Sequence, residues 1–373
     1  MANSSKFRAD HVGSLLRPQS VLEARRRVEA GMIEPDELRE VEDEAIAEAV
    51  KLQKRAGIDV VTDGEFRRKD FRAGFVDAFD GISETVVQKP WKGPQGTVVL
   101  PSVQFTVTER LRQRRRLAEG EAAYLRSLTT SPIKITLIAP GFLVDRFWDD
   151  ETTGAVYESR EELARDVVDA TRREIEALIA EGVQYVQLDN PGYAAYLDDA
   201  NRERVSAAGG DPEAEFDRML AADAAAVAGV ERPRGVSIGL HVCRGNQSSL
   251  WLADGSYDAI AEKLFGGIDV DRFLLEYDDE RAGGFEPLRL IPEGKMAVLG
   301  VVSSKTPRVE TVEEIHARID EATRFVDQDF LAISPQCGFA SVAQGGNAIT
   351  AEVEEAKLRV VSDAALAYWG IEL

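Results

Sequence analysis

Short apolar runs rich in β-branched residues alternate along this chain with longer segments in which apolar residues recur every three or four positions. The first pattern is typical of buried strands and the second of amphipathic helices. Eight short runs occur, so we expect strands at residues 8–13, 58–62, 133–139, 183–188, 236–240, 273–276, 297–302 and 330–334. Eight strands that alternate with helices predict an α/β fold in which a parallel sheet closes into a (β/α)8 TIM barrel.

Three of the helices between these strands are delimited by their own end signals. The segments 37–56 and 161–181 each carry a continuous apolar stripe, and a glycine follows each of them. Glycine is favoured directly after a helix, because it adopts the left-handed conformation without strain. Thr311 and Glu314 have the spacing of a capping box, so we expect a further helix from there to Val326.

One stretch does not fit a simple barrel and is expected to be an insertion. Residues 89–96 contain prolines and glycines and predict a loop, whereas residues 97–107 are rich in β-branched side chains. We therefore expect a β-hairpin near residues 89–108, inserted into a single barrel domain that spans residues 1–373. The basic cluster at residues 110–116 predicts either a solvated helix face or a contact for an anionic substrate tail.

The composition narrows the classes of partner. The formal net charge is −21 and the hydrophobic content is 44%, which suits a globular protein with a sizeable core. Such an acidic surface would repel nucleic acid and anionic membranes, so we expect neither as a partner. No apolar stretch approaches the roughly 18 residues needed to span a bilayer. Because two widely spaced cysteines are not a disulfide framework, we expect a cytoplasmic protein. We expect its partners to be small molecules. Whether it forms a homo-oligomer stays open.

Four side chains that suit a metal ion lie at the ends of three predicted strands. His241 and Cys243 come after the fifth strand, Glu276 ends the sixth, and Cys337 follows the eighth. The carboxyl ends of barrel strands gather at one face, so these side chains are expected to meet there. One nitrogen, two sulfurs and one carboxylate form a tetrahedral donor set that suits Zn²⁺ best among divalent ions. Taken singly, a cysteine is more often a small buried apolar residue, and a glutamate after a strand is more often an exposed loop residue.

Polar residues at three other strand ends predict a place for a zwitterion. Glu65 follows the second strand and Asp189 the fourth, and two carboxylates there would hold an ammonium group. Gly13 and Ser14 follow the first strand, where backbone N–H groups would face an anion. Because an amino acid carries both charges, the sequence predicts an amino-acid ligand at this face. The alternative is structural, since an aspartate after a strand also caps the helix that follows.

These motifs resemble the catalytic C-terminal barrel of the cobalamin-independent methionine synthase family, in its short single-barrel branch. The resemblance extends from His11 to near Ser341. It is carried by Val12-Gly13-Ser14, Gly64-Glu65 with Arg68, Gln187-Leu188-Asp189 with Pro191, His241-x-Cys243, Glu276 and Pro335-x-Cys337-Gly338.

The resemblance implies a zinc-dependent methyl transfer to a thiol. His241, Cys243, Glu276 and Cys337 match the four protein positions around the family's zinc, which binds the sulfur of homocysteine. The resulting thiolate attacks the methyl group of a methylated folate, and methionine is formed. This chemistry is physically coherent, because zinc coordination deprotonates a thiol whose pKa is otherwise about 8.5.

The resemblance also assigns substrate-binding residues, with departures. Ser14, Glu65, Asp189 and the following Asn190 match the substrate-binding segments, although the family has a glutamate where Asn190 stands. Lys305 stands where the family has a histidine that acts as proton donor, and it is the candidate catalytic residue. A lysine is a proton donor if its pKa is lowered and a charge contact if it is not. The family's second barrel, which helps to hold the folate, has no counterpart here, so the methyl donor stays open.

Two other functions are compatible with the same residues. The first is another zinc-dependent alkyl transfer, such as the opening of an epoxide by coenzyme M. That reaction needs cations for a sulfonate, and Arg17, Arg67 and Arg68 are candidates. The second is a non-catalytic barrel whose zinc is structural or stored. A structural site is closed by its four ligands, whereas a catalytic site must accept the sulfur of a substrate.

Overall fold

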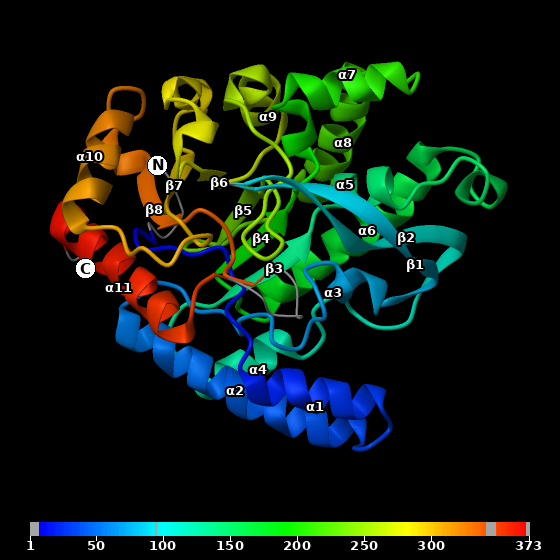
Figure 1. The fold of residues 1–373 in the computed structure, drawn as a ribbon, viewed down its shortest axis with the longest axis horizontal. Helices are drawn as coiled ribbons and strands as arrows, with labels where there is room; N and C mark the ends of the chain where they lie inside the picture. Colours follow the sequence, from blue (N-terminus) through cyan, green and yellow to red (C-terminus); the bar gives the residue numbers. More distant parts are fainter. Residues whose placement is uncertain (1–6, 94, 341–347, 371–373) are drawn as a thin grey trace.

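The computed structural model describes residues 7–93, 95–340 and 348–370. Its centre is a parallel sheet whose six strands lie in chain order from β3 to β8 (Figure 1). These strands are β3 (Lys134–Ile138), β4 (Tyr185–Asp189), β5 (Ser237–Val242), β6 (Arg272–Glu276), β7 (Met296–Val302) and β8 (Leu331–Pro335). Around the sheet lie the helices α1 (Gln19–Glu29), α2 (Pro35–Ala56), α3 (Ala73–Val76), α4 (Glu121–Leu128), α5 (Pro140–Arg146), α6 (Arg160–Ala180), α7 (Asp199–Ala207), α8 (Pro212–Val227), α9 (Ala261–Gly267), α10 (Val312–Ala322) and α11 (Ala351–Trp369).

Two short segments complete the ring between β8 and β3. Ala9 forms a parallel bridge with Ile333 of β8, and Val61 forms one with Ile133, just before β3. The two segments are joined to each other by a hydrogen bond of 3.1 Å from the Asp59 N–H to the Ala9 carbonyl. The sheet therefore closes, and the predicted (β/α)8 barrel is confirmed.

The prediction of regular strands at residues 8–13 and 58–62 is wrong, and aspartate side chains explain why. Asp59 accepts a hydrogen bond from the Ala9 N–H at 2.9 Å, and Asp10 accepts one from the His11 N–H at 2.7 Å. These N–H groups bind side chains and are not available to a neighbouring strand. The other six predicted strands are confirmed, with ends that differ by at most two residues.

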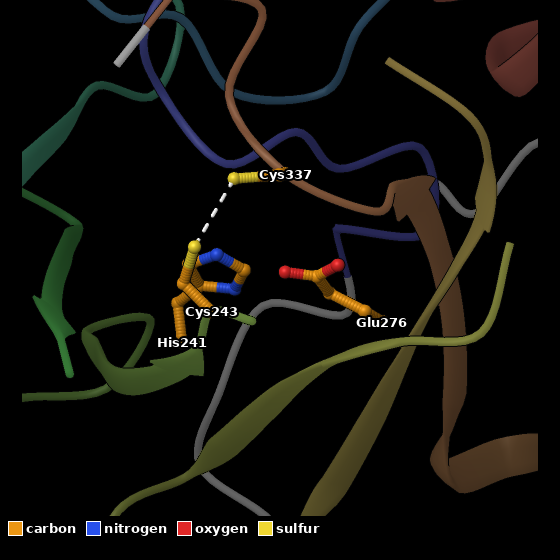
Figure 2. Close-up of side chains that lie close together, drawn as sticks. All are labelled: His241, Cys243, Glu276 and Cys337. Atoms are coloured by element: carbon orange, nitrogen blue, oxygen red, sulfur yellow. Dashed lines mark hydrogen bonds between the residues drawn. The ribbon is translucent and has the colours of Figure 1, made fainter. Parts of the chain in front are cut away.

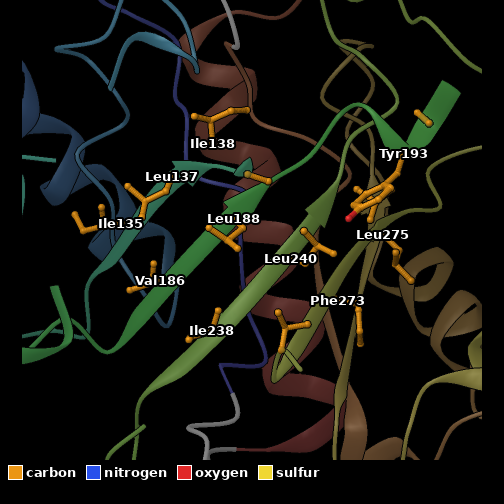
Figure 3. Close-up of a cluster of buried hydrophobic side chains, with 14 of the residues drawn as sticks. Ile135, Leu137, Ile138, Val186, Leu188, Tyr193, Ile238, Leu240, Phe273 and Leu275 are labelled. Carbon is orange, nitrogen blue, oxygen red and sulfur yellow. The ribbon is translucent and has the colours of Figure 1, made fainter. Parts of the chain in front are cut away.

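Alternation along the strands divides their side chains between two layers. Val186, Leu188 and Ile238 belong to the larger core cluster, which lies between the sheet and the helices (Figure 3). The alternate positions point into the barrel, where Leu274 and Val298 belong to a smaller apolar cluster. The last inward position of each strand therefore lies at the carboxyl rim of the barrel.

The three helices predicted from sequence are confirmed as α2, α6 and α10. Gly57 follows α2 in the left-handed conformation, with φ of 81°. Thr311 and Glu314 form the expected capping box of α10, but this helix ends at Ala322 and not at Val326. None of the described helices combines the length and the apolar character that crossing a membrane requires.

The hairpin insertion is confirmed but is longer than predicted. Strand β1 (Phe79–Gly93) pairs antiparallel with β2 (Gly96–Gln113). The expected loop at residues 89–96 is wrong, because β1 continues through Pro90 to its end at Gly93. Proline is tolerated there because both strands of a two-stranded ribbon are edge strands, whose outer N–H groups need no partner.

The tip of the hairpin docks on the loop that follows β5. The backbones of Lys92 and Trp251 exchange two hydrogen bonds, of 2.8 and 2.9 Å. Lys92 Nζ also lies 2.9 Å from a carboxylate oxygen of Asp254. The insertion precedes β3 in the chain but ends against the β5 side of the barrel (Figure 1).

The basic cluster at residues 110–116 is not a helix face, because it begins inside β2. Its side chains pair with carboxylates of the same chain, such as Arg110 with Glu162 and Arg116 with Glu174. These pairs engage the guanidinium groups, so the alternative of a contact for an anionic substrate tail gains no support.

Candidate metal centre and substrate site

The structure brings together the four residues that the sequence singled out as metal ligands. His241 belongs to β5, Cys243 directly follows it, Glu276 ends β6, and Cys337 lies two residues after β8. Their ligand atoms all lie within 4.8 Å of one another. Figure 2 shows the four side chains converging from these three places in the chain. We call these four residues the metal cluster, and their binding of a metal ion stays a proposal.

Strand pairing explains why these side chains meet. β5 and β6 are neighbours in the sheet, and His241 and Glu276 both occupy inward positions near the rim. Gly300 of β7 is the residue paired with Glu276. A Cβ on Gly300 would lie 2.5 Å from the Gln336 Cα, so the absence of a side chain lets the loop of Cys337 approach β7 closely.

The positions of the donor atoms fit a bound ion. The two sulfurs are 3.4 Å apart, well beyond the roughly 2.0 Å of a disulfide. Two sulfurs that share a tetrahedral zinc ion lie about 3.8 Å apart. Nδ1 of His241 lies 3.3 Å from the Leu274 carbonyl, which directs Nε2 toward the cluster. Nε2 is buried and has no hydrogen-bond partner among the described residues, and this is the arrangement expected of a metal-binding histidine.

Backbone N–H groups donate hydrogen bonds to two of the ligands. The Arg244 N–H donates to Oε1 of Glu276 at 2.6 Å. The Gly245 N–H donates to Sγ of Cys243 at 3.2 Å. Hydrogen bonds of this kind hold ligand side chains in position around a metal ion.

The charges within the metal cluster shift its own pKa values. The pKa of Cys337 is lowered well below that of an ordinary thiol, because the Cys243 thiol donates a hydrogen bond to it and His241 lies nearby. Burial lowers the pKa of His241, but the charges of Cys337, Asp189 and Glu276 outweigh burial and raise it. The site therefore favours a thiolate even before any metal is considered.

Lys305, the predicted catalytic residue, reaches the metal cluster from the loop after β7. Its Nζ lies 3.4 Å from Oε2 of Glu276. Burial lowers the pKa of Lys305, but the carboxylates of Glu276 and Asp278 outweigh burial and raise it overall. Lys305 is therefore a cation at neutral pH, and the structure favours a charge contact over a proton donor.

Glu65 stands at the rim in an unusual backbone conformation. Its φ is 60°, which is uncommon for a residue other than glycine and recurs at functional sites. Its buried carboxylate accepts a hydrogen bond from Thr136 Oγ1 at 2.8 Å and lies 3.8 Å from Arg68. Arg68 also pairs with Glu121 at 2.7 Å. Two carboxylates therefore share one guanidinium, so Glu65 retains the capacity to bind a further cation.

Asp189 ends β4 and pairs with His241 in the sheet. Gln187 donates a hydrogen bond to its Oδ1 at 2.8 Å. Burial raises the pKa of Asp189 to about 7, and the charge of Glu65 adds to this effect although His241 opposes it. The two carboxylates are thus close enough to repel, and a cation between them would relieve the repulsion. We call Glu65 and Asp189 the amino-group site.

Ser14 lies against the loop that carries Cys337. Its carbonyl accepts a hydrogen bond from the Phe339 N–H at 2.9 Å, and its Oγ accepts one from the Ala340 N–H at 3.4 Å. A Cβ on Gly338 would lie 2.0 Å from the Ser14 Oγ, so glycine is required for this close approach. Ser14 is therefore adjacent to the metal cluster through the backbone of one loop.

The structure gives no support to the prediction of Asn190 as a substrate contact, because its side chain is hydrogen-bonded elsewhere, and the contact stays a prediction. The side chain is buried and turned toward α8, where its Nδ2 donates to Asp223 at 2.6 Å. Its Oδ1 accepts a hydrogen bond from the Gly192 N–H at 2.8 Å. Because both ends of the amide are occupied, Asn190 fastens the loop after β4 to α8.

Sequence reasoning assigned several residues that support the amino-group site no role in holding Glu65 or Asp189. Arg68 and Gln187 stand inside the motifs quoted above, but nothing in the sequence shows what they contact. Thr136 lies in an apolar run and reads as an ordinary strand residue. Lys134 did leave a signal, since a lysine within an otherwise apolar strand predicts a buried charge with a partner.

A closed (β/α)8 barrel with nitrogen, sulfur and oxygen donors gathered at its carboxyl rim defines the class of protein. It is a barrel enzyme whose candidate metal centre lies where such barrels carry their active sites. The chain belongs to the family described as "Cobalamin-independent synthase, Catalytic domain", whose sequence model matches residues 7–364. It is thereby an enzyme of the S-methyltransferase class.

Individual relatives agree with this family. The uncharacterized protein YxjH of Bacillus subtilis (strain 168) is 39% identical over 97% of this chain and 95% of the relative. A methionine synthase of Pyrococcus abyssi is 25% identical over 88% of this chain and 84% of the relative. A solved structure from Listeria monocytogenes, assigned as a candidate vitamin-B12-independent methionine synthase, has a TM-score of 0.75 at 28% identity and covers 99% of both chains. The predicted fold and family resemblance are confirmed.

Proposed function

We propose that this protein is a zinc-dependent thiol methyltransferase that converts homocysteine to methionine, with a methylated folate or a related compound as methyl donor. The metal cluster carries the proposal, because its four donor atoms lie within 4.8 Å of one another at the active face of the barrel. The family, and relatives that bear the name methionine synthase, support the same reaction.

The donor set of the metal cluster is the ground for proposing zinc. Two sulfurs, one imidazole nitrogen and one carboxylate match the ligands that Zn²⁺ prefers. When bound, Zn²⁺ supplies a Lewis acid that keeps a substrate thiol ionised at neutral pH. Two thiolates and one carboxylate exceed the charge of the dication by one unit, so a sulfur held there stays electron-rich and nucleophilic. The unpartnered Nε2 of His241 supports the same assignment.

The amino-group site is proposed to select an amino acid as the thiol substrate. Burial raises the pKa of Asp189 and the nearby charge of Glu65 adds to this effect, and an ammonium group would neutralise both carboxylates. Ser14 and the backbone of its loop are proposed to face the substrate carboxylate. A substrate held at both ends presents its sulfur to the metal cluster, and this positioning is the main contribution of the chain's own residues.

Lys305 is proposed to act in catalysis as a fixed positive charge. Its ammonium lies 3.4 Å from Glu276 and offsets the excess negative charge of the metal cluster. Replacing it with methionine should lower the rate of methyl transfer while zinc stays bound. A Lys305→Met variant with full activity would remove Lys305 from the mechanism.

The alternative of epoxide opening by coenzyme M gains no support from the arginines. Arg17 donates to the carbonyls of Ala340 and Glu65. Arg68 is engaged by Glu121. Arg67 is paired with Asp43. All three guanidinium groups are thus engaged by groups of the protein, whereas the two carboxylates of the amino-group site suit an ammonium.

X-ray absorption at the zinc edge tests the proposal directly. Zinc-loaded protein is measured alone and after addition of homocysteine, and we expect one additional sulfur neighbour in the second spectrum. A structural or stored zinc would show the same coordination in both, and that result would refute a catalytic role. Incubation of the same protein with homocysteine and a panel of methyl donors, with methionine detected by mass, then identifies the donor.

Three further points stay predictions. We propose that the chain works as one catalytic barrel domain with small molecules as its partners. A cytoplasmic location and the open question of a homo-oligomer await fractionation and sedimentation measurements.

A further inference from the structure

The interior of the barrel beneath Asp189 is polar, which is unusual for this fold. Barrel interiors are normally filled by layers of branched apolar side chains. Here Lys134 of β3, Gln187 of β4 and Arg272 of β6 occupy inward positions, and all three are completely or almost completely buried together with Asp10. Buried charges are retained only where partners are arranged for them.

A continuous set of hydrogen bonds runs from this interior to the amino-group site. Lys134 Nζ donates to Asp10 Oδ1 at 2.6 Å, to the His11 carbonyl at 2.5 Å and to Gln187 Oε1 at 3.0 Å. Gln187 Nε2 in turn donates to the Val12 carbonyl at 2.7 Å and to Asp189 Oδ1 at 2.8 Å. In each hydrogen bond of the series from Lys134 through Gln187 to Asp189, a donor therefore faces an acceptor.

Lys134 determines which end of the Gln187 amide faces Asp189. An ammonium group has only donors, so it must face the amide oxygen and not the amide nitrogen. The NH₂ group is thereby turned to Asp189 and holds one of its carboxylate oxygens. If the amide were reversed, its oxygen would face the carboxylate and repel it, and its NH₂ would face the ammonium.

We propose that Gln187 is a positioning residue for Asp189, oriented by Lys134, and that this pair makes the site specific for thiols that carry an amino group. The inference rests on the proposed function, since it assumes that Asp189 receives the substrate ammonium. With one oxygen held by Gln187, the other oxygen of Asp189 keeps a fixed direction toward the substrate. Gln187 itself does not touch the substrate, so its effect passes entirely through Asp189.

The test compares two thiols that differ only in the amino group. Homocysteine and 4-mercaptobutanoate share the thiol, the chain length and the carboxylate. Their dissociation constants are measured by titration calorimetry on zinc-loaded protein, for the parent and for Gln187→Met, which has a similar length but no hydrogen-bonding group. We expect homocysteine to bind about tenfold more weakly to the variant, the scale of one lost hydrogen bond to a charged group. Binding of 4-mercaptobutanoate and zinc content should not change.

A matched control separates positioning from loss of a buried amide. Gln53 in α2 is also fully buried, and its amide bonds the backbone of Ala49 and Thr62 without contact to Asp189. Gln53→Met should lower stability but keep the preference for homocysteine. If Gln187→Met does not fold, Gln187→Leu is used in its place, because it also removes the amide but fills the space with a differently shaped side chain. In an Asp189→Asn background, Gln187→Met should have no further effect on homocysteine binding.

The outcomes distinguish this inference from the function on which it rests. Equal binding of the two thiols by the parent protein would refute the amino-group site, and with it the proposed substrate. A parent that prefers homocysteine, together with Gln187 variants that keep the full preference, would overturn the positioning role alone. Loss of both thiols in the Gln187 variants would show a general structural role and would equally overturn it.

Discussion

The two sides of the barrel rim hold their functional side chains by different means. The metal cluster is carried by β5, β6 and β8, or lies within two residues of them, so the ladder hydrogen bonds of regular strands fix its position. Ser14 and Glu65 instead follow the segments around Ala9 and Val61, each of which meets its neighbouring strand at one bridge. We call these the regular side and the irregular side.

Buried arginines and a buried glutamate replace the missing ladder on the irregular side. Arg17 donates to the Glu65 and Arg68 carbonyls, and Arg25 donates to the Arg68 carbonyl at 2.8 Å. Glu354 of α11 accepts a hydrogen bond from the Leu16 N–H at 2.7 Å. Backbone groups that no strand satisfies must find other partners when buried. The irregular side therefore depends on buried arginine and glutamate side chains to hold its backbone in place. The regular side is held by its strand ladder, and its charged side chains serve only its chemistry.

The largest expected effect lies on the regular side and concerns metal binding. Cys337→Ser removes a thiolate ligand, and we expect a loss of zinc affinity beyond the roughly 10- to 100-fold typical of changes around the ligands. Because the strand ladder does not depend on Cys337, the metal-free variant should unfold at nearly the same denaturant concentration as metal-free parent. Metal analysis after dialysis against a chelator measures the first quantity and urea unfolding the second.

Cys243→Ser should behave in the same way, because it removes the second sulfur of the cluster, which lies 3.4 Å from that of Cys337. If both variants retain one zinc per chain after dialysis, the metal cluster is wrongly assigned. If either variant unfolds without metal, the fold of the regular side depends on the metal ligands, and this would contradict the comparison.

The next largest effect is expected on the irregular side, where Arg68→Met should destabilise the fold. Arg68 is paired with Glu121 and contacts Glu65, and all three side chains are at least nine-tenths buried. Removing the cation leaves buried carboxylates without their partner, at a cost of about 3–5 kcal/mol in the free energy of unfolding. Arg112→Met is the control, because Arg112 pairs with Asp80 on the surface with 80% of its side chain exposed. Urea unfolding of both variants gives the comparison, and similar losses would contradict it.

Much of the regular side was predictable from sequence, and most of the irregular side was not. His241 and Glu276 could be placed because apolar runs mark strands and barrel strands end at one face. The support of Glu65 by Arg68 and Thr136 joins parts of the chain that no local pattern relates. The hydrogen bond from Asn190 to Asp223 could not be predicted for the same reason, since Asp223 lies on a separate helix. Periodicity reports which face a residue occupies, whereas partners across elements are set by packing.

A pH-dependent effect of intermediate size is expected for Glu354. Burial raises the pKa of Glu354 to about 8, against an opposing hydrogen bond from the Leu16 N–H. The folded protein therefore keeps this proton up to about pH 8, whereas the unfolded chain releases it near its ordinary pKa of 4.5. The stability contributed below pH 4.5 is thus lost progressively as the pH rises toward 8 and is constant beyond it.

Glu354→Gln keeps the acceptor for Leu16 but cannot ionise. We expect the variant to gain stability relative to the parent between pH 5 and pH 8, by on the order of 4 kcal/mol at most. Unfolding in urea at a series of pH values measures the difference. A difference that does not change with pH would show that Glu354 is ionised in the fold and would contradict the prediction.

The smallest effect is expected where an exposed charge contacts the regular side. Lys92 at the hairpin tip pairs with both Asp198 and Asp254, but its side chain is 37% exposed and its backbone is already bonded to Trp251. An exposed ion pair contributes about 0–1 kcal/mol and is weakened by salt. Lys92→Met should therefore change the free energy of unfolding by less than 1 kcal/mol, leave zinc content unaltered, and differ less from the parent in 0.5 M salt than in 0.05 M salt. A loss of unfolding free energy as large as that of Arg68→Met would mean that the backbone hydrogen bonds between Lys92 and Trp251 are insufficient to keep the hairpin in place. The regular side would then also depend on ion pairs for its stability.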